Sequence, residues 1–167
     1  MKYKSKYKSP VGELLIIADD QSLTGLWYTK DSKYYNKEIS EGAVEKPNKA
    51  IDKTKKWLDM YFDGEEPDFM PEISFGGSDF QKRVWEKLLE VPYGVTTTYG
   101  EIAREIKCSS DGTVSAQAVG QAVGHNPISI IVPCHRVIGS DGDLTGYAGG
   151  LKRKKALLQL EGAFDEI

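Results

Sequence analysis

Residues 65–77, EEPDFMPEISFGG, divide the chain into two segments with different hydrophobic patterns. Two prolines and a glycine pair interrupt helices and strands alike, so we interpret this stretch as a linker. Residues typical of strands predominate before it, and apolar residues at helical spacing predominate after it. The total of 167 residues allows one large domain or two small ones. The division predicts an α+β protein with an N-terminal domain over residues 1–75 and a C-terminal domain over residues 76–167.

The N-terminal segment is predicted to form strands followed by a helix. The runs KYKSKYKS, GELLIIAD and LTGLWYT are rich in β-formers, and DDQS between the last two is typical of a turn, which predicts a hairpin. The alternating lysines of the first run would keep an edge strand from pairing with another chain. Residues 48–64 predict a helix that ends at Gly64, because four side chains recur at helical spacing: Ile51, Thr54, Leu58 and Tyr61.

Three helices are predicted after the linker. Ser78 and Gln81 have the spacing of a capping box, and three apolar residues of the same run share one helix face: Phe80, Val84 and Leu88. The run TTTYGEIAREI repeats the box with Thr98 and Glu101, and TVSAQAVGQAVGHNP predicts the third helix. Two short helices joined by a brief connection and followed by an extended apolar run indicate a helix-turn-helix with a wing-like segment.

The charge of the chain limits how it could bind DNA. The net charge is −3, and residues 76–167 carry 10 Lys and Arg against 11 Asp and Glu, a net of −1. DNA binding through a globally basic surface is therefore not expected, and any contact must be local. The run KRKK, Lys152 to Lys155, is the candidate local source; otherwise it is the solvated face of a helix.

Nothing in the sequence directs the chain to a membrane or out of the cell. No apolar run reaches about 18 residues, and the N-terminus lacks the apolar core of a secretory signal. We therefore expect a soluble protein of the cytoplasm, or of the nucleus in a eukaryote, with Cys108 and Cys134 as free thiols. Cys134, His135 and His125 lack the paired spacing of a zinc site, so no metal site is predicted.

Cys134 and His135 are adjacent and follow directly on an apolar run and a proline. Taken alone, this pair is more simply a buried cysteine beside a core histidine. The helix predicted before it carries Gln117 and Gln121 one turn apart, and small residues cover most of the rest of its surface: Ala116, Ala118, Gly120 and Ala122. Such a surface can pack closely on a neighbouring helix or on another molecule, and the residues alone leave both possibilities open.

The run IIVPCHRVIG, with GHNP before it and GYAGGLKRKKALLQLEG after it, closely resembles the O6-alkylguanine-DNA alkyltransferases, also called methylated-DNA–protein-cysteine methyltransferases. PCHRV is the active-site signature of that family, and the match covers roughly residues 78–162 in the same order. The resemblance implies an RNase H-like α/β N-terminal domain followed by a mostly helical, winged-helix-like DNA-binding domain with the helix-turn-helix. It also implies DNA repair by direct reversal: irreversible, single-turnover transfer of the alkyl group from O6-alkylguanine, and from O4-alkylthymine, to Cys134, without a cofactor.

Alkyl transfer to sulfur requires a thiolate, and a free cysteine with a pKa of about 8.5 is mostly protonated at neutral pH. Neighbouring residues of an extended run point to opposite faces, so we expect a water between Cys134 and His135 in place of a direct contact. In the resembled family the matching histidine takes the thiol proton through a water and a glutamate orients it, which implies these roles for His135 and Glu161. The resemblance also assigns Asn126 to holding the recognition helix and the active-site run in register.

The target atom is buried in a base pair, so the nucleotide must leave the stack. By resemblance, Tyr99 presses on the phosphate of the flipped nucleotide and donates its phenol proton to the leaving guanine. The implied partner is double-stranded DNA containing O6-alkylguanine, bound by a monomer through the minor groove, with these contact residues: Tyr99, Ala116, Gln117, Ala118 and Gly120. No membrane partner is expected, and the implied base pocket consists of Val132, Pro133, Tyr147, Ala148 and Gly149.

Two positions depart from the family pattern. Gln117 stands where an arginine usually fills the space left by the flipped base. Glutamine can still wedge into the stack, but it brings no charge. Ala148 stands where some members have serine, which leaves the backbone amide in place. Arg136 belongs to the signature and is expected to pair within the domain. The departures at Gln117 and Ala148 leave the reactive thiol of Cys134 intact.

Three alternatives compete with alkyl transfer. They are a lesion-recognition protein that flips alkylguanine without repairing it, a winged-helix transcription regulator with an incidental Cys–His pair, and a Cys–His hydrolase. Recognition proteins of the first kind have the cysteine replaced, whereas Cys134 is present here. The hydrolase is disfavoured because the histidine adjoins the cysteine and no separate oxyanion element is evident.

Overall fold

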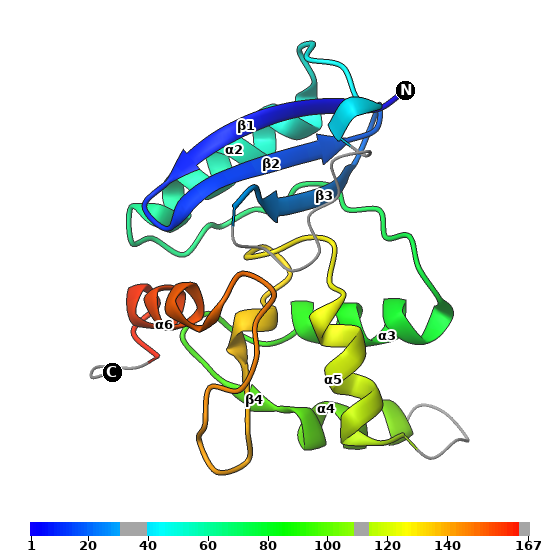
Figure 1. Ribbon diagram of the computed structural model, residues 1–167, viewed down its shortest axis with the longest axis vertical. Helices are drawn as coiled ribbons and strands as arrows, with labels where there is room; N and C mark the ends of the chain where they lie inside the picture. Colours follow the sequence, from blue (N-terminus) through cyan, green and yellow to red (C-terminus); the bar gives the residue numbers. More distant parts are fainter. Residues whose placement is uncertain (31–39, 109–113, 164–167) are drawn as a thin grey trace. The chain divides into compact units, whose positions relative to one another are not determined.

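The computed structural model describes residues 1–30, 40–108 and 114–163, with the side chains of residues 107 and 108 left out. Contacts within the chain divide it into two compact units, Met1–Gly76 and Gly77–Ile167. Each unit has its own secondary structure, a sheet with a helix in the first and mainly helices in the second (Figure 1).

An antiparallel sheet with the strand order β1-β2-β3 forms the first unit. The strands are β1 (Tyr3–Ser9), β2 (Gly12–Ala18) and β3 (Leu23–Tyr28), and the pairing of β2 with β3 confirms the predicted hairpin. The central strand β2 is buried from Leu14 to Ala18. β1 lies at an edge of this sheet, the position that its alternating lysines favour.

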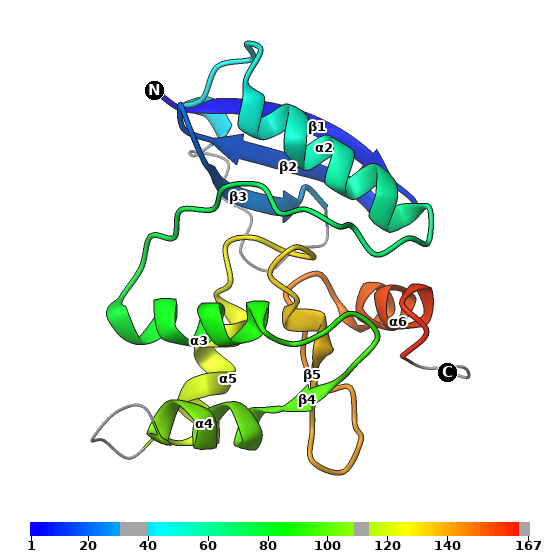
Figure 2. The same cartoon turned by 180° about the vertical axis from the view of Figure 1, so that it is seen from behind.

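The helix α2, Lys49–Phe62, lies across one face of the sheet (Figure 2). Asn48 caps it, because its side-chain oxygen accepts a hydrogen bond from the N–H of Ile51 at 2.9 Å. The side chains predicted at helical spacing are all buried, which confirms the pattern: Ile51, Thr54, Leu58 and Tyr61. Gly64 follows with a φ of +86°, a left-handed conformation that glycine adopts at little cost.

Part of the predicted linker is ordered beside β3. The N–H of Leu23 donates to the carbonyl of Glu72 at 2.7 Å, and the N–H of Ser74 donates to the carbonyl of Leu23 at 3.0 Å. Leu23 and Ile73 thereby form an isolated parallel bridge. A longer strand does not form here, since the prolines of this stretch have no N–H to donate. Residues 72–74 are therefore hydrogen-bonded to β3 and extend the edge of the sheet.

Three helices pack together in the second unit: α3 (Asp79–Leu89), α4 (Tyr99–Cys108) and α5 (Ala116–Gly124). Ser78 and Gln81 form the complete capping box that the sequence predicts. At α4 only one half of the predicted box forms, because the Thr98 hydroxyl accepts from the N–H of Glu101 at 3.1 Å. The carboxylate of Glu101 instead accepts a hydrogen bond from the Thr97 hydroxyl at 3.2 Å.

A buried hydrogen bond joins α3 to α5. The indole N–H of Trp85 donates to the backbone carbonyl of Ala122 at 2.8 Å. Val119, Ala122 and Val123 are the buried side chains of α5, whereas Gln117 is exposed. One side of the small-residue helix therefore packs within the unit, and its first turn remains accessible.

The run predicted as extended forms tight turns instead. Ile130 has a φ of +69°, which is incompatible with a strand. The side-chain amide of Asn126 binds the backbone of Ile128 and Val132, and so replaces the partners that a neighbouring strand would provide. The 3-10 helix η1, Cys134–Arg136, follows directly. The prediction of an extended run was wrong because apolar character alone does not distinguish a buried strand from a buried loop.

A short strand and a helix complete the second unit. β5, Val137–Ile138, pairs in parallel with β4, Thr97–Thr98. Residues 139–150 then lead to α6, Leu151–Leu160, with Glu161 at its C-cap (Figure 2). Within the ranges that the structure describes, no helix is long and apolar enough to cross a bilayer.

Candidate active site

Cys134 opens η1, and only 5% of its surface is exposed. Successive side chains of a 3-10 helix are about 120° apart, so Cys134 and His135 are not on opposite faces as an extended run would place them. Burial raises the pKa of the Cys134 thiol, while the amide of Asn126 and the ammonium of Lys154 act in the opposite direction. The resting group is therefore a thiol at neutral pH. The side chain of Cys108, expected to be the second free thiol, lies outside the described residues.

His135 and Glu161 form a buried pair beside this thiol. His135 Nε2 lies 2.6 Å from Glu161 Oε2, and both side chains are inaccessible to solvent. Arg136 donates from Nε to Glu161 Oε1 at 2.8 Å and from Nη1 to the carbonyl of Val91 at 2.7 Å, which confirms that it pairs within the domain. The N–H of Gly94 donates to the same Oε1 at 3.1 Å. With both oxygens bound, the carboxylate is fixed toward His135.

These contacts determine the charges of the pair. Burial opposes the ionisation of Glu161, but the hydrogen bonds from His135 and Arg136 outweigh it, together with the positive charges of Arg136 and of His135 once it is protonated, and lower the pKa of Glu161 to about 2. Burial lowers the pKa of His135, and Glu161 offsets only part of this effect. At neutral pH the pair is thus a carboxylate with a neutral imidazole. Nε2–H donates to Glu161, and the buried Nδ1 carries the lone pair that can accept a proton.

Asn126 is buried at the turn that follows α5. Its Nδ2 donates to the carbonyls of Ile128 at 3.0 Å and Val132 at 2.9 Å, and its Oδ1 accepts from the N–H of Ile128 at 3.0 Å. The same amide lowers the pKa of Cys134. One side chain therefore joins the end of α5 to the turns that lead to the thiol.

Tyr99, the first residue of α4, lies close to α5 and to the loop after β5. Its hydroxyl is 2.9 Å from the hydroxyl of Thr145. Gly120 of α5 faces the aromatic ring, and a Cβ at that glycine would lie 3.7 Å from Cδ1 of Tyr99. Burial raises the pKa of the Tyr99 phenol, the hydrogen bond to Thr145 lowers it, and a negative charge on Cys134 raises it. Ionisation of Cys134 would therefore make the phenol of Tyr99 harder to ionise.

Lys154 of α6 is a residue of this site that our sequence analysis missed. It is fully buried. Its Nζ donates hydrogen bonds to three backbone carbonyls, those of Val137 at 2.6 Å, Leu144 at 2.5 Å and Gly146 at 3.1 Å. Burial lowers its pKa to about 8, while the charge of Asp143, and that of Cys134 when it is ionised, act in the opposite direction. The run KRKK is therefore not a wholly solvated face, and Lys154 is not available to DNA. A signal was present, because Lys154 shares the apolar helix face with Leu157 and Leu158, three and four residues on.

The predicted DNA-contact residues of α5 lie in its first half. Ala116 and Gln117 are exposed, and Ala118 and Gly120 are half-buried. Ser115 fixes the start of the helix, since its hydroxyl accepts from the N–H of Ala118 at 3.0 Å. The structure thus brings these four positions together at one accessible helix end, with the ring of Tyr99 beside Gly120.

The predicted pocket residues come from two segments, one directly before the cysteine and one in the loop before α6: Val132, Pro133, Tyr147, Ala148 and Gly149. Val132, Pro133 and Gly149 are buried, whereas Tyr147 and Ala148 are half-buried. The ring of Tyr147 meets the imidazole of His135 edge-on, with 6.5 Å between ring centres. This contact brings the loop beside the Cys134–His135 turn.

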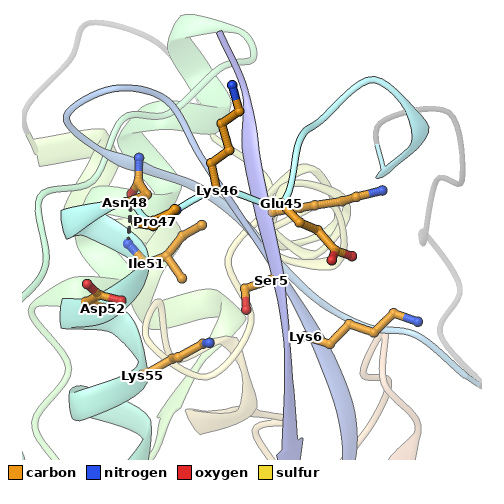
Figure 3. Close-up of a pocket in the computed structure, with 10 residues that line it drawn as sticks. Ser5, Lys6, Glu45, Lys46, Pro47, Asn48, Ile51, Asp52 and Lys55 are labelled. Atoms are coloured by element: carbon orange, nitrogen blue, oxygen red, sulfur yellow. Dashed lines mark hydrogen bonds between the residues drawn. The ribbon is translucent and has the colours of Figure 1, made fainter.

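A cavity of about 470 Å³ in the first unit holds none of the predicted site residues. It lies between β1 and the start of α2 (Figure 3), and its charged lining has both signs: Lys4, Lys6, Lys46, Lys55, Glu45 and Asp52. Lys4 donates to the carbonyl of Ser40 at 2.7 Å, and Lys6 lies 3.9 Å from Glu13. Two of the four lysines of the lining therefore already have partners within the unit. Across the described ranges, no three His, Cys, Asp or Glu side chains are grouped to hold a metal ion.

Two family models match the chain, one for each unit. Residues 2–75 match the 6-O-methylguanine DNA methyltransferase, ribonuclease-like domain, and residues 79–163 match the 6-O-methylguanine DNA methyltransferase, DNA binding domain. The chain therefore belongs to the 6-O-methylguanine DNA methyltransferase family. This finding confirms the resemblance carried by PCHRV and the α+β fold with a ribonuclease-like N-terminal domain.

Relatives and solved structures agree with the family models. The methylated-DNA–protein-cysteine methyltransferase of Methanosarcina acetivorans is 42% identical over 161 residues, which cover 96% of this chain and 99% of the relative. The protein of that name from Mycobacterium bovis is 58% identical over 104 residues, which span 62% of this chain and only 61% of the relative. A crystal structure of Mycobacterium tuberculosis OGT in complex with DNA is similar with a TM-score of 0.81 at 42% identity, covering 96% of this chain and 93% of that one.

Proposed function

We propose that this chain repairs DNA by direct reversal, as a methylated-DNA–protein-cysteine S-methyltransferase that acts once per molecule. Its domain over residues 76–167 would transfer the alkyl group of O6-alkylguanine, and of O4-alkylthymine, to Cys134. The observation that carries the proposal is the buried thiol of Cys134 beside a neutral His135 that an ionised Glu161 holds at 2.6 Å. Displacement at an alkyl carbon needs such a nucleophile with an oriented base.

In the proposed mechanism the thiol proton moves first. Nδ1 of His135 takes up the proton of Cys134 through a bridging water, and Glu161 stabilises the resulting imidazolium. The thiolate, stabilised by Asn126 and Lys154, attacks the alkyl carbon, so that the S–C bond forms as the C–O6 bond breaks. The electron pair stays with guanine, and Tyr99 supplies the proton that neutralises it. The thioether is stable, so Cys134 is not regenerated and no cofactor is consumed.

Duplex DNA containing the lesion is the proposed partner, bound by a monomer through the minor groove. The accessible first turn of α5 carries small residues, which allow its backbone to come close to a groove. Gln117 is the proposed wedge that occupies the space of the flipped nucleotide. The similarity to the M. tuberculosis structure solved with DNA supports this assignment. The cytoplasm is the proposed location, or the nucleus in a eukaryote.

Intact-mass analysis tests the proposal. Mixing the wild-type chain with duplex O6-methylguanine DNA should add one methyl group, about 14 Da, to the protein. Cys134→Ser should abolish the increment while leaving DNA affinity, measured by fluorescence anisotropy, nearly unchanged, because the thiol contributes little contact area. Transfer in that variant would place the nucleophile elsewhere. Tight binding by the wild type without an increment would indicate lesion recognition without repair.

A further inference from the structure

We propose that Thr145 is a positioning residue for alkyl transfer: its hydroxyl donates a hydrogen bond to the phenol oxygen of Tyr99 and thereby directs the phenol proton toward the leaving guanine. The inference rests on the proposed function, in which Tyr99 protonates the guanine. The two hydroxyl oxygens are 2.9 Å apart although 46 residues separate them in sequence. The contact therefore exists only in the folded domain.

The backbone of Thr145 is held in an unfavourable conformation. Its φ of +56° lies in the left-handed region, where a β-branched residue is rarely found. The ammonium of Lys154 binds the carbonyls on both sides of it, those of Leu144 at 2.5 Å and Gly146 at 3.1 Å. Backbone strain persists where the surroundings impose it, and it concentrates at functional sites. Here the buried Lys154 imposes the direction in which the Thr145 side chain leaves the loop.

Two glycines complete this arrangement. A Cβ at Gly139 would lie 3.1 Å from Cγ2 of Thr145, so the glycine leaves room for the methyl group. With the methyl group on that side, Oγ1 faces Tyr99. The ring of Tyr99 rests in turn beside Gly120. The surroundings of Thr145 and Tyr99 thus hold both hydroxyls in position, as a preorganised site requires.

The direction of the hydrogen bond follows from the chemistry. A hydroxyl has one proton and two lone pairs, so Tyr99 must accept from Thr145 if its own proton is to reach guanine. A bond in this direction lowers the pKa of the phenol, against burial and the charge of Cys134, which raise it. As the S–C bond forms and the C–O6 bond breaks, the phenol O–H proton passes to guanine. The phenolate keeps its electron pair and the bond from Thr145, and then regains a proton from solvent.

Thr145→Val removes the hydroxyl and keeps the shape of the side chain. We expect it to slow methyl transfer from duplex O6-methylguanine DNA by about five- to tenfold, the effect of one hydrogen bond. Thr145→Ser should restore the rate. Alkylation of Cys134 by iodoacetamide should be unaffected by Thr145→Val, because iodide leaves without a proton. Thr97→Val is the matched control. It makes the same change at a threonine two residues before Tyr99, whose hydroxyl binds Glu101 instead of the phenol.

A double-mutant cycle with Tyr99→Phe tests whether Thr145 acts through the phenol. In the Tyr99→Phe background, Thr145→Val should cause no further loss of transfer rate. An equal loss in both backgrounds, an unchanged rate in Thr145→Val, or a parallel loss of iodoacetamide reactivity would each overturn the role of Thr145 while leaving the proposed function intact. Absence of any methyl transfer by the wild-type chain would instead overturn the proposed function, and this inference with it.

Discussion

Glu161 serves two side chains with one carboxylate. Oε2 contacts His135 at 2.6 Å and Oε1 contacts Arg136 at 2.8 Å. In the proposed mechanism the first contact orients a base, whereas the second compensates a buried guanidinium, which is costly to leave without a counter-charge. Substitution of this residue should therefore affect both reactivity and stability, and the two effects must be measured separately.

His135→Ala and Glu161→Gln should each slow methyl transfer by about a hundredfold or more, the usual contribution of a general base. The first variant lacks the proton acceptor. In the second, the imidazolium loses its carboxylate, so the pKa of His135 falls further and the base weakens. Both should move the pH dependence of Cys134 alkylation by iodoacetamide to higher pH. Glu90→Gln, at an exposed carboxylate, is the control, and an unchanged profile in both variants would exclude the proton relay.

The helices could be predicted from local sequence because their ends carry their own signals. Asn48 caps α2, and the Ser78–Gln81 box opens α3, so these bounds depend on residues within one turn. The turns before η1 could not be predicted, since they depend on the buried amide of Asn126 and on the positive φ of Ile130. These features are set by tertiary packing, which the apolar pattern does not encode.

The candidate site shows the same contrast. Cys134, His135 and Glu161 were identified through the resemblance to a known family, and the structure places the last two in contact. Lys154 was missed because it stands in a run of basic residues, where a single buried ammonium resembles its solvated neighbours. Thr145 was missed because its hydroxyl matters only through Tyr99, a contact between segments far apart in sequence.

With Gln117, α5 should stabilise the flipped state of the nucleotide in duplex DNA less well, because a neutral side chain stands where the family usually has arginine. We expect Gln117→Arg to raise the transfer rate on duplex O6-methylguanine DNA and to steepen its salt dependence, since the cation lies among phosphates. The rate with a free-base pseudosubstrate should stay the same, because nothing is flipped. Gln121→Arg, exposed one turn further along α5, controls for added charge alone. An equal change in both rates would place the effect in the chemistry or the fold.

Trp85→Phe should loosen the packing of α3 on α5. It removes the donor to the carbonyl of Ala122, whose remaining bond from the N–H of His125 is 3.2 Å long. We expect a loss of about 1–2 kcal/mol in the free energy of unfolding, the usual effect of removing one partner of a buried hydrogen bond. Urea denaturation followed by circular dichroism measures it. No change in the denaturation midpoint would mean that this hydrogen bond does not contribute to stability.

At the scale of the whole molecule, the buried pair makes stability depend on pH. Glu161 has a pKa of about 2 in the folded chain against 4.5 for an ordinary glutamate, so its contribution is complete above pH 4.5 and is lost as the pH falls toward 2. The contribution is on the order of 3 kcal/mol. His135, whose pKa is lowered from 6.5, acts in the same direction at higher pH, because the unfolded chain binds its proton more readily.

Urea denaturation from pH 7 to pH 3 should therefore show a falling free energy of unfolding, with one decline below pH 6.5 and another below pH 4.5. Glu161→Gln should be less stable at pH 7 and should lack most of the second decline, since an amide does not titrate. Equal slopes below pH 4.5 in the wild type and this variant would show that other carboxylates are responsible.

Lys154 of α6 and Glu161 at its C-cap lie seven residues apart, close to two full turns, so the helix presents a cation and an anion on the same side. Each residue added to or removed from a helix turns everything beyond it by about 100°. An insertion or deletion of one residue between these two positions would carry Glu161 away from His135 even if every letter of PCHRV were preserved. Between Lys154 and Glu161, the number of residues therefore matters to the site as much as their identity.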